Sequence, residues 1–191
     1  MTKIVLASAS PRRAQLLDQL GLQYEIMSTD VDECALTNEI VEEYVQRVTL
    51  LKAKAASENI AFPALIIAAD TTVSIAGKIL GKPDSKSHFL DMFMSLSGKT
   101  HRVYTAIVVT SGKTTKHALS VNEVDFRPIS RREALSYWHS GEPQGKAGGY
   151  AIQGLGAMFV AQIRGSYTGV MGLPLFELTQ LLNQFDVQIL E

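Results

Sequence analysis

The chain has little cysteine and no excess of charge of either sign. Its single cysteine, Cys34, excludes an internal disulfide framework and a cysteine-rich zinc site. The 18 basic residues balance 19 acidic ones. The protein therefore has no overall positive field for binding nucleic acid, and any anion site must be local.

Several familiar catalytic motifs are also missing. The sequence has neither Gly-x-Gly-x-x-Gly after a strand nor Gly-x-x-x-x-Gly-Lys-Ser/Thr, which argues against Rossmann and P-loop sites. It has no Gly-x-Ser-x-Gly, and Cys34 has no recognisable partner, so hydrolysis through a protein nucleophile is poorly supported. The four histidines share no metal-ligand spacing.

Long hydrophobic runs are absent as well. The longest, such as ALIIAA at 64–69, are far shorter than the roughly 20 residues of a membrane-spanning helix. The apolar run in MTKIVLASASP is too short for a signal-peptide core. With 46% hydrophobic residues, the chain has enough apolar material for a packed core. We therefore predict a soluble cytoplasmic protein that binds neither membranes nor nucleic acid.

Hydrophobic periodicity predicts alternating strands and helices, with an antiparallel excursion in the middle of the chain. This pattern is typical of an α/β fold with a mixed sheet. Strands are predicted at 3–7, 23–28, 64–80 with a turn near Gly77, 101–110, 114–126 and 157–167, and helices at 12–20, 40–57, 85–97, 130–139 and 174–184.

The stretch LASASPRR at 6–13 joins the first strand to the first helix. Ser10 is a typical N-cap and Pro11 a typical first helical residue. The free N–H groups of such a helix start form a phosphate site, to which Arg12 and Arg13 add planar, permanently charged donors. The alternative is a capped surface helix with two solvated arginines.

Asp70 interrupts an apolar strand in IIAADTTV. We predict that its carboxylate lies at the end of that strand and lines a cleft, as sites do in α/β folds. A carboxylate beside bound phosphates holds Mg²⁺ or Mn²⁺, or takes a proton from water. The acidic loop containing Asp30, Asp32 and Glu33 is a candidate for the second metal ligand. An aspartate starting a turn and a solvated acidic loop are the alternatives.

Three lysines and a glutamine are further candidates. Lys52 and Lys54 lie two apart on a predicted helix, so at most one can enter a given cleft. Lys82, in a Gly-Lys-Pro turn, is either a phosphate contact or a solvated lysine. Gln153 lies in the glycine-rich segment 145–160, where its amide would read the edge of a base or remain on the surface.

Taken together, LASASPRRAQLL, AADTTV, GKP, KAGGYAIQG and GSYTGVMGLPL resemble the Maf family of nucleoside triphosphate pyrophosphatases over essentially the whole chain. The resemblance implies a single domain over 1–191, with an elongated twisted sheet and two lobes enclosing a nucleotide cleft, similar to inosine triphosphate pyrophosphatases. It also implies metal-dependent hydrolysis of a nucleoside triphosphate to the monophosphate and pyrophosphate, in the cytoplasm, by a homodimer.

Three positions distinguish branches of this family. The proline is followed by Arg12, the aspartate by Thr71, and the glycine is preceded by Gln153, which resembles the branch acting on dTTP and UTP. The branch acting on 7-methyl-GTP has tryptophan, glutamine and glutamate there. The usual Gly-Ala-Asp-Thr reads Ala-Ala-Asp-Thr at 68–71, a departure that leaves the chemistry unchanged.

Carried over by position, Asp70 is the expected general base and, with Glu33, the expected metal ligand. Arg12, Thr71 and Gln153 are the expected determinants of base choice. The expected triphosphate-binding residues are Ser8, Ser10, Arg12, Arg13, Lys52 and Lys82. The alternative function is a nucleotide-binding regulator of cell division or septum formation with incidental hydrolysis. Two nearby carboxylates disfavour it, because a pure anion-binding site would gain from losing negative charge.

Overall fold

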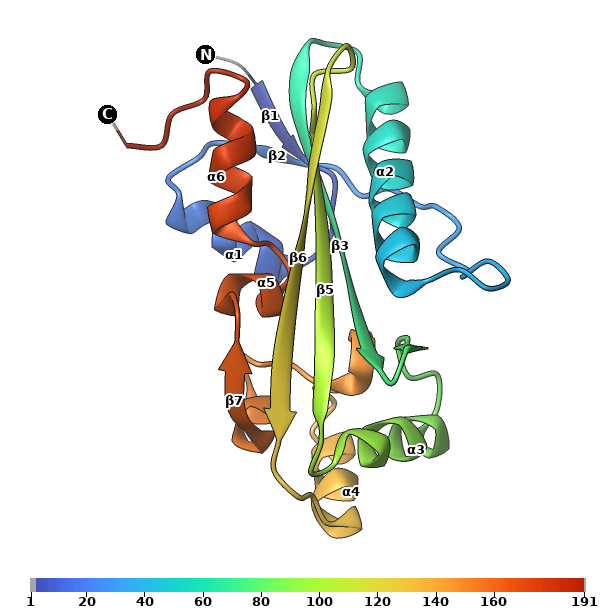
Figure 1. Ribbon diagram of the computed structural model, residues 1–191. Helices are drawn as coiled ribbons and strands as arrows, with labels where there is room; N and C mark the ends of the chain where they lie inside the picture. Colours follow the sequence, from blue (N-terminus) through green and yellow to red (C-terminus); the bar gives the residue numbers. More distant parts are fainter. Residues whose placement is uncertain (1–2, 191) are drawn as a thin grey trace.

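The computed structural model describes residues 3–190. One mixed, twisted sheet runs along the molecule, with α2 on one face, α6 on the other, and α3 and α4 at the far end (Figure 1). The strands are β1 (Lys3–Leu6), β2 (Glu25–Ile26), β3 (Ala64–Ile75), β4 (Lys78–Leu80), β5 (Thr100–Thr110), β6 (Thr115–Phe126) and β7 (Val160–Arg164). The α-helices are α1 (Pro11–Gln19), α2 (Val41–Asn59), α3 (Lys86–Leu96), α4 (Arg131–His139), α5 (Tyr167–Met171) and α6 (Leu175–Asn183). The predicted α/β class with a mixed sheet is confirmed.

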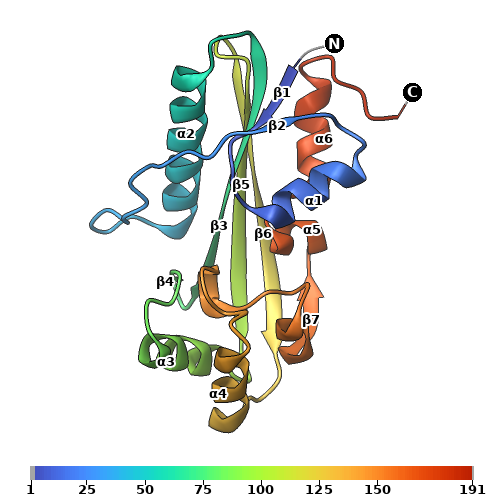
Figure 2. The same cartoon turned by 180° about the vertical axis from the view of Figure 1, so that it is seen from behind.

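The strand order is β2-β1-β3-β5-β6-β7, and β4 pairs with the far end of β3. β1 pairs in parallel with β2 and β3, and the remaining pairs are antiparallel. The main core includes Phe89, Phe93 and Phe159. A smaller core holds α2 against the sheet through Ala53 and Ala56. Seen from behind, α1 and α5 lie next to each other beside the sheet (Figure 2).

Most predicted elements are present, and three differ. The strand predicted at 23–28 is only the two-residue β2, which pairs with the last two residues of β1. The strand predicted at 157–167 starts at Val160, after a 3₁₀ turn over Leu155–Phe159. The short helix α5 was not predicted. No helix among residues 3–190 is long and apolar enough to cross a membrane.

The position of the site follows from how β3 is paired. Along one edge of β3, β1 pairs with residues 64–67 and β4 pairs with residues 73–75. Between them, residues 68–72 have no strand partner on that side within the described chain, whereas β5 pairs along the opposite edge from Ile66 to Ser74. The sheet therefore has a gap in its middle.

Candidate active site

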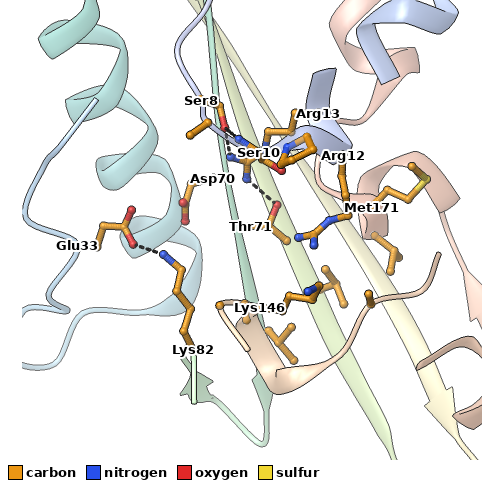
Figure 3. A pocket seen from close by; sticks show the side chains of 18 of the residues that line it. Ser8, Ser10, Arg12, Arg13, Glu33, Asp70, Thr71, Lys82, Lys146 and Met171 are labelled. Atoms are coloured by element: carbon orange, nitrogen blue, oxygen red, sulfur yellow. Dashed lines mark hydrogen bonds and ion pairs between the residues drawn. The ribbon is translucent and has the colours of Figure 1, made fainter. Parts of the chain in front are cut away.

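A cavity of about 480 Å³ opens beside this gap (Figure 3). Such a volume is typical of small-molecule sites. Its walls come from the turn after β1, the loop before α2, the unpaired edge of β3, the segment 145–152 and the end of α5. Segments from both ends of the sheet thus enclose it. The expected site residues that line it are Ser8, Ser10, Arg12, Arg13, Glu33, Lys52, Asp70, Thr71 and Lys82.

Asp70 lies in the middle of β3, so the prediction that it ends its strand is wrong. The strand that ends here is β1, whose last residue, Leu6, pairs with Ile67. Successive side chains of a strand point to opposite faces. Figure 3 shows Asp70 on one side of β3 and Thr71 on the other. Both reach one cavity because no neighbouring strand closes the edge between them.

On the α2 face, one ammonium group connects two carboxylates. Lys52 Nζ lies 2.6 Å from Asp70 Oδ1 and 2.7 Å from Glu33 Oε1. Lys82 Nζ lies 3.1 Å from Glu33 Oε2. As expected, Lys54 stays outside the cavity, in an exposed pair with Glu58.

Glu33 is held in its ionised form by these lysines. Burial acts to raise the pKa of Glu33, but the hydrogen bonds and charges of Lys52 and Lys82 outweigh it and lower that pKa below its usual value. The acidic loop therefore contributes one paired carboxylate to the cavity, whereas Asp32 accepts a local hydrogen bond from Cys34 N.

The Asp70 and Glu33 carboxylates are the oxygen donors that this cavity offers a divalent cation, and Lys52 and Lys82 contact three of their four oxygens. Mg²⁺ is commonly held by one or two carboxylates together with substrate phosphates and waters, whereas an all-protein cage needs more ligands. Among residues 3–190 there is no group of three or more histidine, cysteine or acidic side chains that forms such a cage. Two carboxylates sharing one cavity are the donor set expected for a metal–phosphate complex.

On the opposite face, Arg13 is tied to the protein. Its Nε donates to Gly172 O at 2.8 Å, one terminal nitrogen to Ser8 Oγ at 2.9 Å, and the other to Thr71 Oγ1 at 3.2 Å. Burial lowers the pKa of Arg13, and the charge of Asp70 opposes this. A guanidinium has five N–H donors, so two N–H groups of Arg13 have no acceptor within residues 3–190 while its position is fixed.

The turn after β1 leaves hydroxyl groups available. Ser8 Oγ accepts from Ser10 N at 3.3 Å and from Arg13, so its own O–H remains for a ligand. Ser10 occupies the predicted N-cap position, with Pro11 next, but its side chain makes no capping bond. The predicted cap is thus confirmed in position, and the Ser10 hydroxyl is free to face the cavity.

Thr71 is engaged in hydrogen bonds within the protein, which restricts the contacts it offers a ligand. Thr105 Oγ1 donates to Gly169 O at 2.8 Å. The 3.0 Å contact between Thr71 Oγ1 and Thr105 Oγ1 therefore uses the Thr71 hydrogen. Thr71 also accepts from Arg13. A ligand can meet Thr71 only through its methyl group or a remaining lone pair.

Gln153 is exposed and is not among the residues that line the cavity, although its neighbours Ala151 and Ile152 are. Its role in base choice stays a prediction. Sequence reasoning missed Lys146, which lines the same wall. The signal was present, because Lys146 begins KAGGY, two residues before the glycine pair.

The family model described as Maf-like protein matches residues 3–185. The chain belongs to this family. A Maf-like relative of Cupriavidus pinatubonensis named dTTP/UTP pyrophosphatase is 50% identical, over 95% of this chain and 96% of that protein. A relative of Methylobacillus flagellatus with the same name is 48% identical, over 99% of this chain and 96% of that protein. One of Acinetobacter baylyi is 47% identical, over 94% and 97%.

Two solved structures have partial similarity to this Maf-like chain. The Ham1 protein of Staphylococcus aureus is 18% identical, covers 65% of this chain and 72% of its own, and has a TM-score of 0.47. A nucleoside-triphosphatase, or dITP/XTP pyrophosphatase, of Mycobacterium abscessus is 14% identical, covers 67% and 74%, and has a TM-score of 0.42.

Proposed function

We propose that this Maf-like protein hydrolyses dTTP and UTP to the monophosphate and pyrophosphate, by attack of water on the α-phosphorus. The names of relatives 47–50% identical over nearly the whole chain support this substrate class. Arg12, Thr71 and Gln153 resemble the pattern of the dTTP/UTP branch, which disfavours 7-methyl-GTP.

The observation that carries the proposal is the position of the Asp70 carboxylate. It lies in one cavity with the Ser8–Arg13 turn, whose serine hydroxyls and arginines are suited to phosphate. Lys52 binds one Asp70 oxygen. The geometry supports Asp70 Oδ2 as the acceptor of the proton of water, with Lys52 orienting the carboxylate.

The positive groups around the cavity would stabilise the leaving group. Charge grows on the departing pyrophosphate, and fixed cations in a partly buried site stabilise it without reorganising during the reaction. Arg12, Arg13 and Lys82 line the cavity for this purpose. A Mg²⁺ or Mn²⁺ ion held by Asp70 and Glu33 would polarise the phosphate when bound. No covalent intermediate is needed.

The Maf resemblance also supports a single catalytic domain that works as a cytoplasmic homodimer and removes modified pyrimidine nucleotides. Sedimentation of the purified chain tests the oligomeric state. A panel of natural and modified triphosphates tests the range of substrates.

The deciding experiment measures pyrophosphate release from dTTP, UTP, CTP, ATP, GTP and 7-methyl-GTP with Mg²⁺. We expect turnover with dTTP and UTP. We expect Asp70→Asn to lower it by at least ~100-fold, the range of a general base, while the fold is kept. Asp91→Asn, which changes an exposed carboxylate on α3, is the matched control. Saturable binding without product would support the regulator instead, and near-normal release by Asp70→Asn would remove Asp70 from the mechanism.

A further inference from the structure

Lys146 lines the wall of the cavity formed by the glycine-rich segment 145–152. Figure 3 shows Lys146 and Arg12 reaching into the cavity from different segments of the chain. Neither residue forms an ion pair with a carboxylate among residues 3–190. Each is therefore available to donate to an acceptor on a ligand.

The protein holds the Lys146 ammonium in place and leaves a donor unused. Its Nζ donates to Glu142 O at 2.6 Å and makes a long contact of 3.5 Å with Gln144 O. An ammonium has three donors, so at least one remains for a ligand. Burial, and then the charge of Arg12, lower the pKa of Lys146.

Glu142 anchors this wall and forms no ion pair with Lys146 within the described chain, although its charge partly opposes the lowering of the Lys146 pKa. Its Oε1 accepts from Tyr137 OH at 2.7 Å and from Gly156 N at 2.9 Å, and its Oε2 accepts from Leu155 N at 2.9 Å. Both carboxylate oxygens are thus engaged by the protein. The carboxylate fixes the loop, and the lysine is left to face the cavity.

Apolar side chains from β5, α5 and the same wall also line the cavity. These are Val103, Tyr150, Ile152, Val170 and Met171. An apolar slot with one or two fixed donors is the form expected for a flat base. Figure 3 shows Asp70 and Glu33 on the other side of β3 from Lys146 and Met171.

The pyrimidine bases differ in what they present to such a donor. Uracil and thymine carry a keto oxygen at the position where cytosine carries an amino group. An ammonium donates a hydrogen bond to the keto oxygen, whereas it meets only hydrogens on the amino group. We propose that Lys146 is a specificity-determining residue that donates to this keto oxygen and so favours uracil and thymine over cytosine. The inference rests on the proposed function and adds a residue to it.

The test compares kcat/KM for UTP and CTP in the wild type and in Lys146→Met, which keeps the length of the side chain but removes its donors. A hydrogen bond from a charged group contributes a factor of about 10–100 to discrimination between two ligands. We therefore expect the UTP-to-CTP ratio to fall by at least about tenfold in this variant. Lys146→Arg, which keeps charge and donors, should retain more of the ratio. Lys99→Met, which removes an exposed ammonium on the surface, should leave it unchanged.

Equal losses on UTP and CTP would overturn the inference, because a phosphate contact or a loop support acts on every triphosphate alike. No change on either substrate would also overturn it. If the wild type releases pyrophosphate from no triphosphate, the proposed function fails. Calorimetric binding of UTP and CTP to the wild type and Lys146→Met then decides the inference alone. A greater loss of affinity for UTP than for CTP supports the inference, and an equal loss or no loss overturns it. Should Lys146→Met fail to fold, the same comparison is made with Lys146→Gln.

Discussion

Lys52 Nζ lies 2.6 Å from Asp70 Oδ1, and both side chains are nearly buried, at 11% and 12% exposure. The lysine comes from α2 and the aspartate from β3. The same ammonium also binds Glu33, so one positive charge holds two carboxylates that would otherwise repel each other. The packing of α2 on the sheet therefore sets the geometry of the acidic groups.

Removing Lys52 should destabilise the protein more than removing its exposed neighbour. Lys52→Met leaves a buried carboxylate without its partner, and we expect the free energy of unfolding to fall by about 3 kcal/mol at pH 7. Lys54→Met breaks only the exposed pair with Glu58 and should change it by less than about 0.5 kcal/mol. Urea denaturation measures both. In the double variant Lys52→Met/Asp70→Asn, at least half of the lost free energy of unfolding should be recovered. Equal losses in the single and double variants would contradict the pairing.

Arg13 should not be replaceable by lysine. Its guanidinium reaches three acceptors in different directions, on Gly172, Ser8 and Thr71. A lysine ammonium at the end of a flexible stem cannot reproduce this fork. We expect Arg13→Lys to lose about 2–3 kcal/mol of stability and at least about tenfold of kcat/KM for dTTP. Arg12→Lys is the comparison, because it makes the same replacement at the neighbouring arginine. Equal retention of activity by Arg12→Lys and Arg13→Lys would count against the positioning of Arg13.

Stability should depend on pH through the buried His101. Its Nε2 lies 2.7 Å from Tyr150 OH, and burial lowers the pKa of His101 to about 4. In the unfolded chain the group takes up a proton near its ordinary value of about 6.5. Because the unfolded state binds more protons between these values, stability should fall by about 3 kcal/mol as the pH falls from 6.5 to 4.

The measurement is the free energy of unfolding from pH 7 to pH 4 for the wild type and His101→Phe, which fits beside Phe126. The variant should lack this part of the pH dependence, so the difference between the two proteins should shrink or reverse at acid pH. His139→Gln, at an exposed position, should follow the wild type. Parallel curves for His101→Phe and the wild type would show that His101 does not carry the effect.

Gly149 should resist substitution for two reasons. Its φ of +69° disfavours any side chain, and a Cβ there would lie 2.9 Å from Phe89 Cδ2 in the core. Gly77 has φ +78° with no neighbour within 4 Å of a Cβ, so Gly77→Ala carries the backbone cost alone, about 1–2 kcal/mol. We expect Gly149→Ala to cost about 1–3 kcal/mol more, because it also overpacks the core. Thermal unfolding of the two variants checks this, and equal midpoints would refute the contact.

The sequence alone determined most of the elements and most of the reactive groups. Periodicity and end signals act over a few residues, so the Ser130–Glu133 capping box and the Pro11 helix start could be identified without a fold. The motif pattern likewise identified Asp70, Glu33 and Lys52, which the structure brings together.

Only the tertiary structure decided how these groups meet. That β1 and β4 share one edge of β3, leaving 68–72 open, depends on pairing between distant segments, which no local pattern encodes. The same pairing places Asp70 inside its strand and lets Thr71 reach the cavity from the other face. It also binds Arg13 to Gly172, 159 residues away, and brings Lys146 to the wall of the cavity. Short-range sequence signals specify which side chains are present, whereas long-range packing specifies which of them remain free to bind a ligand.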